Sequence, residues 1–246
     1  MKLDVLAIAA HPDDTELCCS GTLVALARSG KKVGVLDLTH GEMGTRGTPE
    51  KRLEEAQKAA GILGLSVREN AGLPDCGLDN TSPFREKIIQ FVRRYQPDIC
   101  FVNAPEDRHP DHRNAANLTL DALFYSGLKK LETRDNGDRQ SPWRPHHILH
   151  YMQHWPFRPT MVFDITDTID LKEQAIRAFS SQFDIDEQDE GPHTYVSDRR
   201  FFEALRSRAR EYGQQIGVPF GEPFLYYGGP LPVSNLDFLF QSKPMR

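Results

Sequence analysis

The sequence predicts an α/β fold in which a mostly parallel sheet is flanked by helices. Short apolar runs alternate with helical segments of roughly 12 to 15 residues, which is the pattern of strand–helix–strand units. The apolar runs are continuous, as expected for parallel strands that are buried on both faces. The 246 residues are 39% hydrophobic and 26% charged. That composition and length suit a globular protein with a substantial core.

Turn and capping signals place the elements of the first half in order. Residues 3–10 (LDVLAIAA) form an apolar run that ends at His11-Pro12, and they predict a buried strand. Helical spacing continues over 16–29 and stops at Gly30, because glycine favours helix ends. The remaining predictions are a strand at 32–39, a Gly-rich loop at 41–48, a helix at 49–63, a strand at 67–73, a helix at 83–95, a strand at 98–103 and a helix at 111–131.

The second half is less regular. A polar loop at 132–144 contains the turn signal Asn136-Gly137. We expect strands at 146–154 and 160–165, helices at 171–181 and 197–215, and an acidic loop at 184–191. The tail from Pro219 onward has too little periodicity for an assignment. Since no repeat or linker divides the chain, we expect one Rossmann-like domain over 1–246, with a motif-bearing part at about 1–131 and a C-terminal elaboration at about 145–246.

Charge and composition exclude several classes of protein. The net charge of −5 argues against the basic footprint of a nucleic-acid binder. No apolar run approaches the ~20 residues that span a bilayer. The N-terminus enters a strand without a signal-peptide layout, so we expect a cytoplasmic protein without a membrane partner. The four cysteines, Cys18, Cys19, Cys76 and Cys100, form no C-x-x-C pair and are expected to be reduced thiols.

Two polar clusters follow apolar strands directly. The first is His11-Pro12-Asp13-Asp14-Thr15-Glu16, and the second is Glu106-Asp107-Arg108-His109-Pro110-Asp111-His112. In an open parallel sheet, ligands bind outside the carboxyl ends of the strands. Imidazole and carboxylate ligands suit a divalent ion of the zinc, nickel or iron type, and three protein ligands leave a position open for catalysis. The remaining acids and imidazoles could take a proton from water or stabilise an oxyanion.

Structural interpretations compete with this one. Asp13 or Asp14 could cap a helix, and His109 could be a surface histidine. Taken alone, Arg52 is read as surface charge, and the His146, His147 and His150 group as strand or surface histidines. Both clusters lie at predicted strand ends, and this coincidence favours a metal site.

The first cluster, extended to Ala10 and followed by Ser20-Gly21-Thr22, resembles the A-H-P-D-D-x-E-x-x-x-G-G motif of the PIG-L/LmbE family of zinc-dependent N-acetylglucosaminyl deacetylases. His109-Pro110-Asp111-His112 is similar to that family's H-P-D-H motif. Ser20 replaces the first motif glycine, and we expect only a local adjustment there. The likeness covers roughly residues 3–217 and includes Asp37-Leu38-Thr39, Gly47-Thr48 with Arg52, Pro74-Asp75-x-Gly77-Leu78 and Ser181-Gln182-Phe183. Within the family the pattern most resembles the bacillithiol-pathway branch.

The resemblance implies an LmbE-like fold and a role for each matching position. Zinc, with Fe²⁺ as the alternative ion, would be held by His11, Asp14 and His112. Asp13 would be the general base that activates water and the proton donor to the leaving amine. The other implied roles are oxyanion stabilisation by His109 with Asp111, and substrate contacts by Arg52, Asp75, Arg108 and Tyr195. A homo-oligomer, a trimer or a hexamer, is also implied.

The function that we expect is a zinc-dependent amidohydrolase that releases acetate from an N-acetylglucosamine (GlcNAc) conjugate, and most directly from N-acetylglucosaminyl L-malate. Arg52 and Arg108 favour an anionic aglycone, because a guanidinium fork matches a carboxylate. The alternatives are a chitobiose-like, inositol or thiol conjugate, or an Fe(II) oxygenase, since two histidines and a carboxylate also describe a facial triad. A nucleotide-binding module is disfavoured because the first turn lacks G-x-G-x-x-G.

Overall fold

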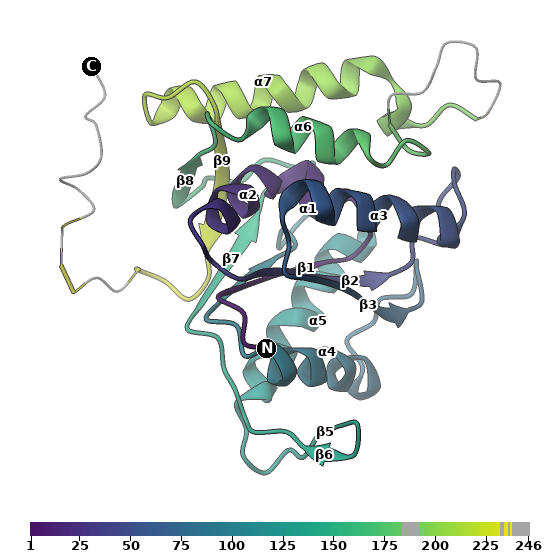
Figure 1. Ribbon diagram of the computed structural model, residues 1–246, viewed down its shortest axis with the longest axis vertical. Helices are drawn as coiled ribbons and strands as arrows, with labels where there is room; N and C mark the ends of the chain where they lie inside the picture. The colour runs from purple at the N-terminus through teal and green to yellow at the C-terminus, as the bar shows by residue number, and fades with distance from the viewer. Residues whose placement is uncertain (184–191, 232–233, 236, 238–246) are drawn as a thin grey trace.

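The computed structural model describes residues 1–183, 192–231, 234–235 and 237. Its main element is a seven-stranded sheet in the order β3-β2-β1-β4-β7-β9-β8 (Figure 1). The strands are β1 (Val5–Ala9), β2 (Val33–Thr39), β3 (Val67–Leu73), β4 (Ile99–Val102), β7 (His147–Tyr151), β8 (Met161–Asp164) and β9 (Gly221–Tyr226). A separate hairpin pairs β5 (Arg134–Asp135) with β6 (Asp138–Arg139).

The sheet is parallel from β3 to β7 and antiparallel beyond β7. The parallel pairs are β2–β3, β1–β2, β1–β4 and β4–β7, whereas β9 runs antiparallel to both β7 and β8. The prediction of a mostly parallel sheet in an α/β fold is therefore confirmed. Since β4 pairs with β7, one sheet continues from the motif-bearing part into the C-terminal elaboration. The assignment to a single domain stays a prediction.

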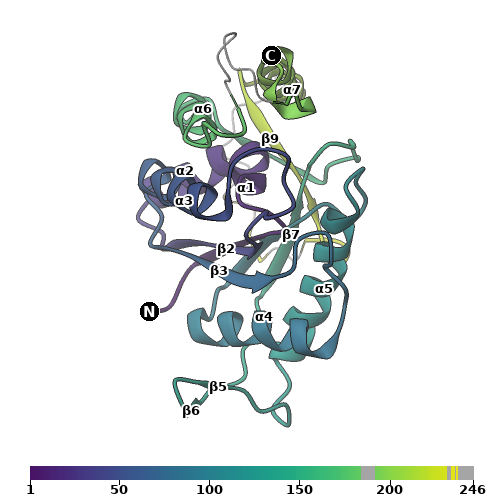
Figure 2. The ribbon, with the colours of Figure 1, turned by 90° about the vertical axis from the view of Figure 1, so that its right-hand side faces the viewer.

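Helices cover both faces of the sheet. They are α1 (Asp14–Cys18), α2 (Ser20–Arg28), α3 (Pro49–Leu63), α4 (Ser82–Tyr95), α5 (Pro110–Ser126), α6 (Ile169–Arg177), the 3₁₀ turn η1 (Tyr195–Ser197) and α7 (Arg199–Gln215). Helices α4 and α5 lie on one face and α1 to α3 on the other, with α6 and α7 stacked outside them (Figure 2). Helix α6 packs against α2 and α3, and α7 packs against β9.

Strands β1 and β2 are buried along their whole length, as continuous apolar runs predict for central parallel strands. Their side chains join separate hydrophobic clusters on the two faces, so that Leu6 and Ile8 pack on the α4–α5 side while Val5 and Ala7 pack towards α2. This packing fixes the carboxyl end of β1, where the first polar cluster begins.

The helix predicted at 16–29 is two helices. The chain breaks at Cys19 (φ −140°, ψ 7°), so α2 has its own N-terminus. There the buried Glu222 carboxylate accepts hydrogen bonds from the Gly21 and Thr22 amides at 3.0 and 2.8 Å. A carboxylate at a helix N-terminus satisfies amides that have no partner within the helix. Continuous helical spacing could not reveal this partner, which lies 201 residues from Gly21.

The local adjustment expected at Ser20 is small. The Ser20 hydroxyl donates to the Glu16 carbonyl at 2.7 Å, and the side chain is fully buried. The following glycine is the constrained position, because a Cβ at Gly21 would lie 2.9 Å from the Ile165 side chain.

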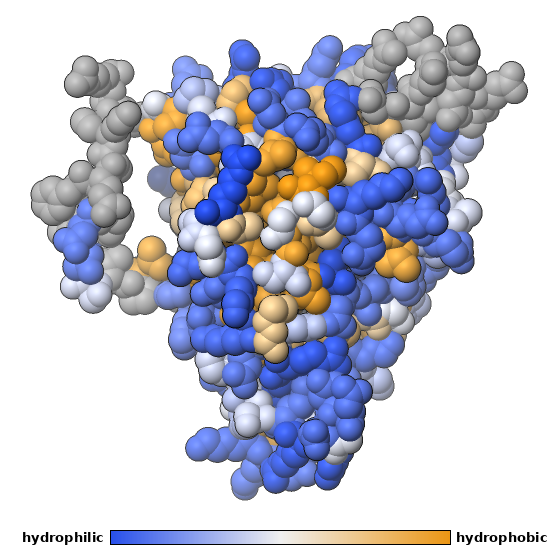
Figure 3. Space-filling model, viewed as in Figure 1, coloured by the Kyte–Doolittle hydropathy of each residue, from blue (hydrophilic) through white to orange (hydrophobic). Residues whose placement is uncertain are grey.

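Strand β9 is the main element that the sequence did not predict, because its Pro- and Gly-containing run gives little periodicity. Helix α5 ends at Ser126 rather than near residue 131, and α6 spans Ile169–Arg177 rather than 171–181. The predicted acidic loop at 184–191 lies outside the described residues. The hairpin at the lower end of the molecule is hydrophilic, whereas hydrophobic side chains gather near α2 on the face shown in Figure 3. Among the described helices, none combines the length and apolarity needed to cross a bilayer.

Candidate active site

The two polar clusters meet at the carboxyl edge of the parallel strands. His11 and Asp14 follow β1, Asp75 follows β3, and the segment from Asp107 to His112 follows β4. The rings of His11 and His112 lie 5.4 Å apart between centroids. Residues about a hundred positions apart therefore share one site, as the predicted strand ends required.

The Asp14 carboxylate lies between two imidazoles. His112 Nε2 is 3.2 Å from Asp14 Oδ1, and His11 Nδ1 is 3.7 Å from Asp14 Oδ2. Amides orient the same carboxylate, since Gln153 Nε2 donates to Oδ1 at 3.2 Å and Asn103 Nδ2 to Oδ2 at 3.3 Å.

In each imidazole, the ring nitrogen that faces away from Asp14 contacts a second carboxylate. His11 Nε2 is 3.1 Å from Asp75 Oδ1, and His112 Nδ1 is 3.1 Å from Asp107 Oδ1. Ligand histidines in metalloproteins have this arrangement, in which an outer carboxylate fixes the tautomer and orients the ring. Donor atoms of His11, His109 and His112 lie within 4.8 Å of one another, as do those of His11, Asp75 and Asp111, and neither of these two sets includes the predicted ligand Asp14. The ligand set His11, Asp14 and His112 therefore stays a prediction. The chemistry of this donor set fits a divalent ion of the zinc or iron type.

Charge within the cluster favours an ionised Asp14. Burial by itself raises the pKa of a carboxyl, but the imidazoles of His112 and His11 outweigh it and hold the pKa of Asp14 well below its ordinary value. Burial opposes protonation of His112, yet Asp14 and Asp107 raise its pKa to about 9. The imidazoles therefore hold protons that a bound cation would displace.

Cys18 is a poor candidate for a further ligand. It lines the cavity beside Asp14, but burial raises the pKa of its thiol to about 12. A protonated thiol binds metals weakly, since the thiolate is the ligand form. All four cysteines are free, which agrees with the expectation of reduced thiols.

Asp13 is held by Arg52. Arg52 Nη2 donates to Asp13 Oδ2 at 2.8 Å and to the Pro12 carbonyl at 2.5 Å, while Nη1 reaches the Gly41 carbonyl at 3.3 Å. Burial raises the pKa of Asp13 to about 7, although the guanidinium opposes the shift. Asp13 also has φ 112°, a backbone conformation that costs on the order of 1–3 kcal/mol and often marks functional sites. Arg52 is 5% exposed and its guanidinium contacts Asp13, and the substrate contact implied for it stays a prediction.

His109 stacks on His112 with 4.9 Å between ring centroids. Its Nδ1 accepts the Asp111 backbone amide at 3.2 Å, which assigns the proton of a neutral ring to Nε2. The Asp111 carboxylate faces elsewhere, since Oδ2 accepts the Cys76 amide at 2.7 Å and lies 3.5 Å from His11 Nε2. The predicted pairing of His109 with Asp111 thus runs through the amide, and the roles of both residues stay predictions.

A cavity of about 460 Å³ opens from this cluster towards α7, and Asp14, His109 and His112 line it. The predicted substrate contacts Arg108 and Tyr195 also line it, with the Arg108 guanidinium 4.9 Å above the Tyr195 ring. Asp75 is not among the residues that line the cavity. Its carboxylate contacts His11 and accepts the Cys76 and Met43 amides, and its sugar contact stays a prediction.

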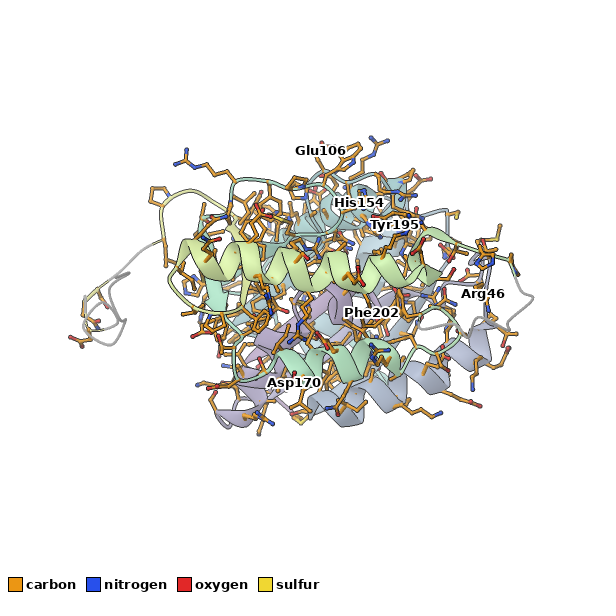
Figure 4. The ribbon with its side chains drawn as sticks, turned by 90° about the horizontal axis from the view of Figure 1, so that it is seen from above. Arg46, Glu106, His154, Asp170, Tyr195 and Phe202 are labelled. Carbon is orange, nitrogen blue, oxygen red and sulfur yellow. The ribbon has the colours of Figure 1, made fainter. Side chains whose placement is uncertain are left out.

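Several residues that line the cavity have no role predicted from the sequence. Gln153 and His154 follow β7, whose carboxyl end lies at the same edge of the sheet, so a polar pair after this strand was an available signal. Arg208 lies on α7 and had no such signal. Figure 4 shows His154 and Tyr195 beside each other along α7, where their rings meet edge to face at 5.3 Å. Asp107 lay within the second cluster without a predicted role.

A buried network of ion pairs connects Glu16 of the first cluster to β2 and β3. Arg68 on β3 donates to Glu16 at 2.6 Å and to Asp37 at 2.8 Å, and these three side chains are at most 4% exposed. The guanidinium pairs with both carboxylates, and this pairing offsets the free energy that burying an unpaired charge would cost. Glu16 of the first motif therefore holds α1 in place rather than facing the cavity.

The family model "PIG-L: GlcNAc-PI de-N-acetylase" matches residues 6–123, which contain both polar clusters. Diacetylchitobiose deacetylase from Thermococcus kodakarensis is 32% identical over 189 residues, covering 73% of this chain and 70% of that protein. The chain belongs to the PIG-L family.

Two further comparisons extend this result. The crystal structure of the conserved protein TT1542 from Thermus thermophilus is 38% identical, has a TM-score of 0.83 and covers 95% of this chain and 97% of that one. The probable N-acetyl-α-D-glucosaminyl L-malate deacetylase 2 of Bacillus anthracis is 30% identical over 132 residues, or 48% of this chain and 58% of that protein. This PIG-L protein is thus an enzyme, and its tertiary structure extends the likeness well beyond the matched 118 residues, into the part that contains Tyr195 and α7.

Proposed function

We propose that this enzyme hydrolyses the N-acetyl group of a GlcNAc conjugate and releases acetate. The supporting observation is the Asp14 carboxylate between two imidazoles whose far nitrogens rest on Asp75 and Asp107, next to an acid held by a guanidinium. This set contains the ligands, the base and the donors that amide hydrolysis needs.

His11, Asp14 and His112 would hold the metal ion, with zinc proposed first and Fe²⁺ as the alternative. When bound, such an ion polarises the amide carbonyl and makes water more acidic. Asp75 and Asp107 orient the two imidazoles, and Gln153 and Asn103 orient Asp14. Such outer contacts orient ligand side chains.

Asp13 is the proposed base. Its carboxylate takes a proton from the attacking water and returns it to the amine nitrogen as the C–N bond breaks, so no net proton stays on the enzyme. A group with a pKa near the working pH serves best in both directions. Arg52 fixes the orientation of the carboxylate through its 2.8 Å contact.

His109 is the proposed oxyanion donor. Because its Nδ1 accepts the Asp111 amide, a neutral ring carries its proton on Nε2. A donor that is already oriented stabilises charge as it develops on the carbonyl oxygen. Asp111 then acts on this ring through its amide rather than through its carboxylate.

The aglycone is the less determined part of the proposal. The malate conjugate is proposed first because Arg108 lines the cavity and a Bacillus relative carries that name. A neutral chitobiose-like sugar is the second candidate, because the Thermococcus relative is named for it. An inositol or thiol conjugate is a further alternative, and the homo-oligomer and the cytoplasmic location stay predictions.

Acetate release from N-acetylglucosaminyl malate, diacetylchitobiose and an inositol conjugate, with metal content measured on the same sample, tests the proposal. We expect acetate in proportion to bound metal. Oxygen-dependent product without acetate would favour an oxygenase instead. A thermal shift with NAD or ATP and none with zinc would favour a nucleotide-binding module. Equal or faster turnover of neutral sugars would eliminate the malate assignment alone.

A further inference from the structure

The cavity next to the metal-ligand candidates has two chemically different sides. Asp14, His109 and His112 line one side, where the chemistry is proposed to occur. The opposite side is formed by η1 and α7, which lie beyond the family match, and by Leu17 of α1, which lies within it. Whatever group is attached to the reacting sugar and enters the cavity must meet this second side.

Two arginines line the cavity without an acidic partner. Arg108 follows β4 and Arg208 lies on α7. Within the described residues, neither guanidinium has a carboxylate oxygen within 4.0 Å, whereas Arg52 and Arg206 do. Arg208 Nη1 donates to the Gln153 carbonyl, which leaves its other donors without an acceptor among those residues.

Both arginines affect the pKa of the same imidazole, that of His154. Burial and the Arg108 guanidinium lower the pKa of His154, Asp107 opposes this shift, and the Arg208 guanidinium lowers the pKa more weakly. Asp107 also lines the cavity, but its oxygens contact His112 and the amides of His154 and Trp155 rather than either guanidinium. The two guanidinium charges therefore have no carboxylate in direct contact among the described residues.

The apolar surroundings strengthen the interactions of the two guanidinium charges, and Tyr195 orients Arg108. Apolar side chains of Leu17, Val196, Phe201 and Leu205 form much of the cavity wall. Such a wall lowers the local dielectric constant, so a charge pair within it is stronger than one in water. Arg108 is also oriented in advance by its contact with the Tyr195 ring at 4.9 Å. An aromatic face suits the planar guanidinium and leaves its edge free for hydrogen bonds.

We propose that Arg208 and Arg108 form an anion subsite, which takes a carboxylate or phosphate carried by the group attached to the sugar. The enzyme's substrates are then acidic GlcNAc conjugates, and Arg208 is their specificity determinant. This inference rests on the proposed deacetylase function. The sequence favoured an anionic aglycone because of Arg52 and Arg108. In the subsite, Arg208, which lines the cavity, takes the place of Arg52, which does not.

The test compares Arg208→Gln with Arg210→Gln as the matched control. Arg210 lies on the same helix, but its guanidinium faces Phe220 at 5.5 Å and does not line the cavity. The substrates are N-acetylglucosaminyl malate, N-acetylglucosamine 1-phosphate and the neutral methyl glycoside. Because hydrogen bonds between charged groups are the strong ones, we expect Arg208→Gln to lower kcat/KM for the acidic substrates by about 10- to 100-fold, mainly through KM. The neutral glycoside and Arg210→Gln should stay within about twofold of the wild type.

The acidic substrate whose kcat/KM falls more on Arg208→Gln shows whether the subsite prefers a carboxylate or a phosphate. An equal loss on all three substrates, or no loss on either acid, would overturn the subsite. Calorimetric binding of the deacetylated malate conjugate separates this failure from failure of the proposed function. If no conjugate releases acetate but this acid binds the wild type and binds Arg208→Gln at least tenfold more weakly, the subsite stands without the reaction. If the acid does not bind the wild type, the subsite is rejected.

Discussion

The part of the chain within the family match and the part beyond it contribute differently to the site. Residues 6–123 supply the imidazoles, Asp13 and Asp14 from the ends of buried parallel strands. The later part supplies a cavity wall from η1 and α7, where Tyr195 is 53% exposed. We therefore propose that the chemistry depends on the first part, and that the choice of substrate depends on the second part together with Arg108. Substitutions of the ligand and base candidates in the first part should then affect every conjugate alike, and those in the second part or at Arg108 should discriminate among conjugates.

Asp13→Asn should give the largest effect. The amide keeps the size of the side chain and a contact to Arg52 but cannot take a proton, so kcat should fall by about 10²- to 10⁴-fold on every conjugate. Metal content, measured by elemental analysis, should stay at the wild-type level. Loss of the metal would show that Asp13 is a ligand, and a loss confined to one conjugate would break the comparison.

Arg68→Met tests whether the first part is held rigid by its buried ion network. Removing the guanidinium leaves the Glu16 and Asp37 carboxylates unpaired in the interior, which should lower the free energy of unfolding by about 3–5 kcal/mol. Urea unfolding measures the change. The control is Arg94→Met, because the Arg94 pairs with Glu69 and Asp135 are partly exposed and should be worth at most about 1 kcal/mol. Similar losses for both variants would argue against a special role for the network.

Asp107→Asn should weaken the metal site without removing a ligand. Asp107 orients His112 through the 3.1 Å contact to Nδ1, and loss of such an outer carboxylate typically costs 10- to 100-fold in metal affinity, here measured by chelator competition. Asp198→Asn, at the N-terminus of α7, should leave metal affinity unchanged. An unchanged affinity for Asp107→Asn would mean that His112 needs no such support.

Tyr195→Ala should give the smallest effect, and only in substrate binding. Its ring supports Arg108 through a cation–π contact worth about 0.5–1 kcal/mol at an exposed site, so KM for an acidic conjugate should rise by about two- to fivefold. Tyr195→Phe should retain wild-type KM, since the aromatic face remains. A change in metal content would contradict the division between the two parts.

The same division explains what the sequence could predict. His11, Asp14 and His112 lie in short motifs directly after apolar strands, and parallel strand ends meet at one edge, so local pattern was enough to bring them together. The mostly parallel character of the sheet followed from the alternation of strands with helices in the same way. These inferences needed only neighbours in sequence.

Contacts between segments that are distant in the chain could not be predicted from the sequence. Glu222 accepts the Gly21 amide at the start of α2 from 201 residues away, and Arg208 lines the cavity from a helix without a motif. Arg52 and Asp75 carry charges that suit a substrate, yet the fold places them against Asp13 and His11. A residue's chemistry was readable from the sequence, whereas the choice between protein and substrate as its partner depended on packing.

Acetate release from N-acetylglucosaminyl malate by the wild type and His112→Ala, before and after chelation and return of zinc, tests the central claim most directly. The wild type should lose acetate release on chelation and regain it with zinc. His112→Ala should fail in both states, because Asp14 and His11 alone would not retain the ion. Full acetate release by the chelated wild type, or by His112→Ala with no metal bound, would contradict the assignment of the two clusters to one metal centre.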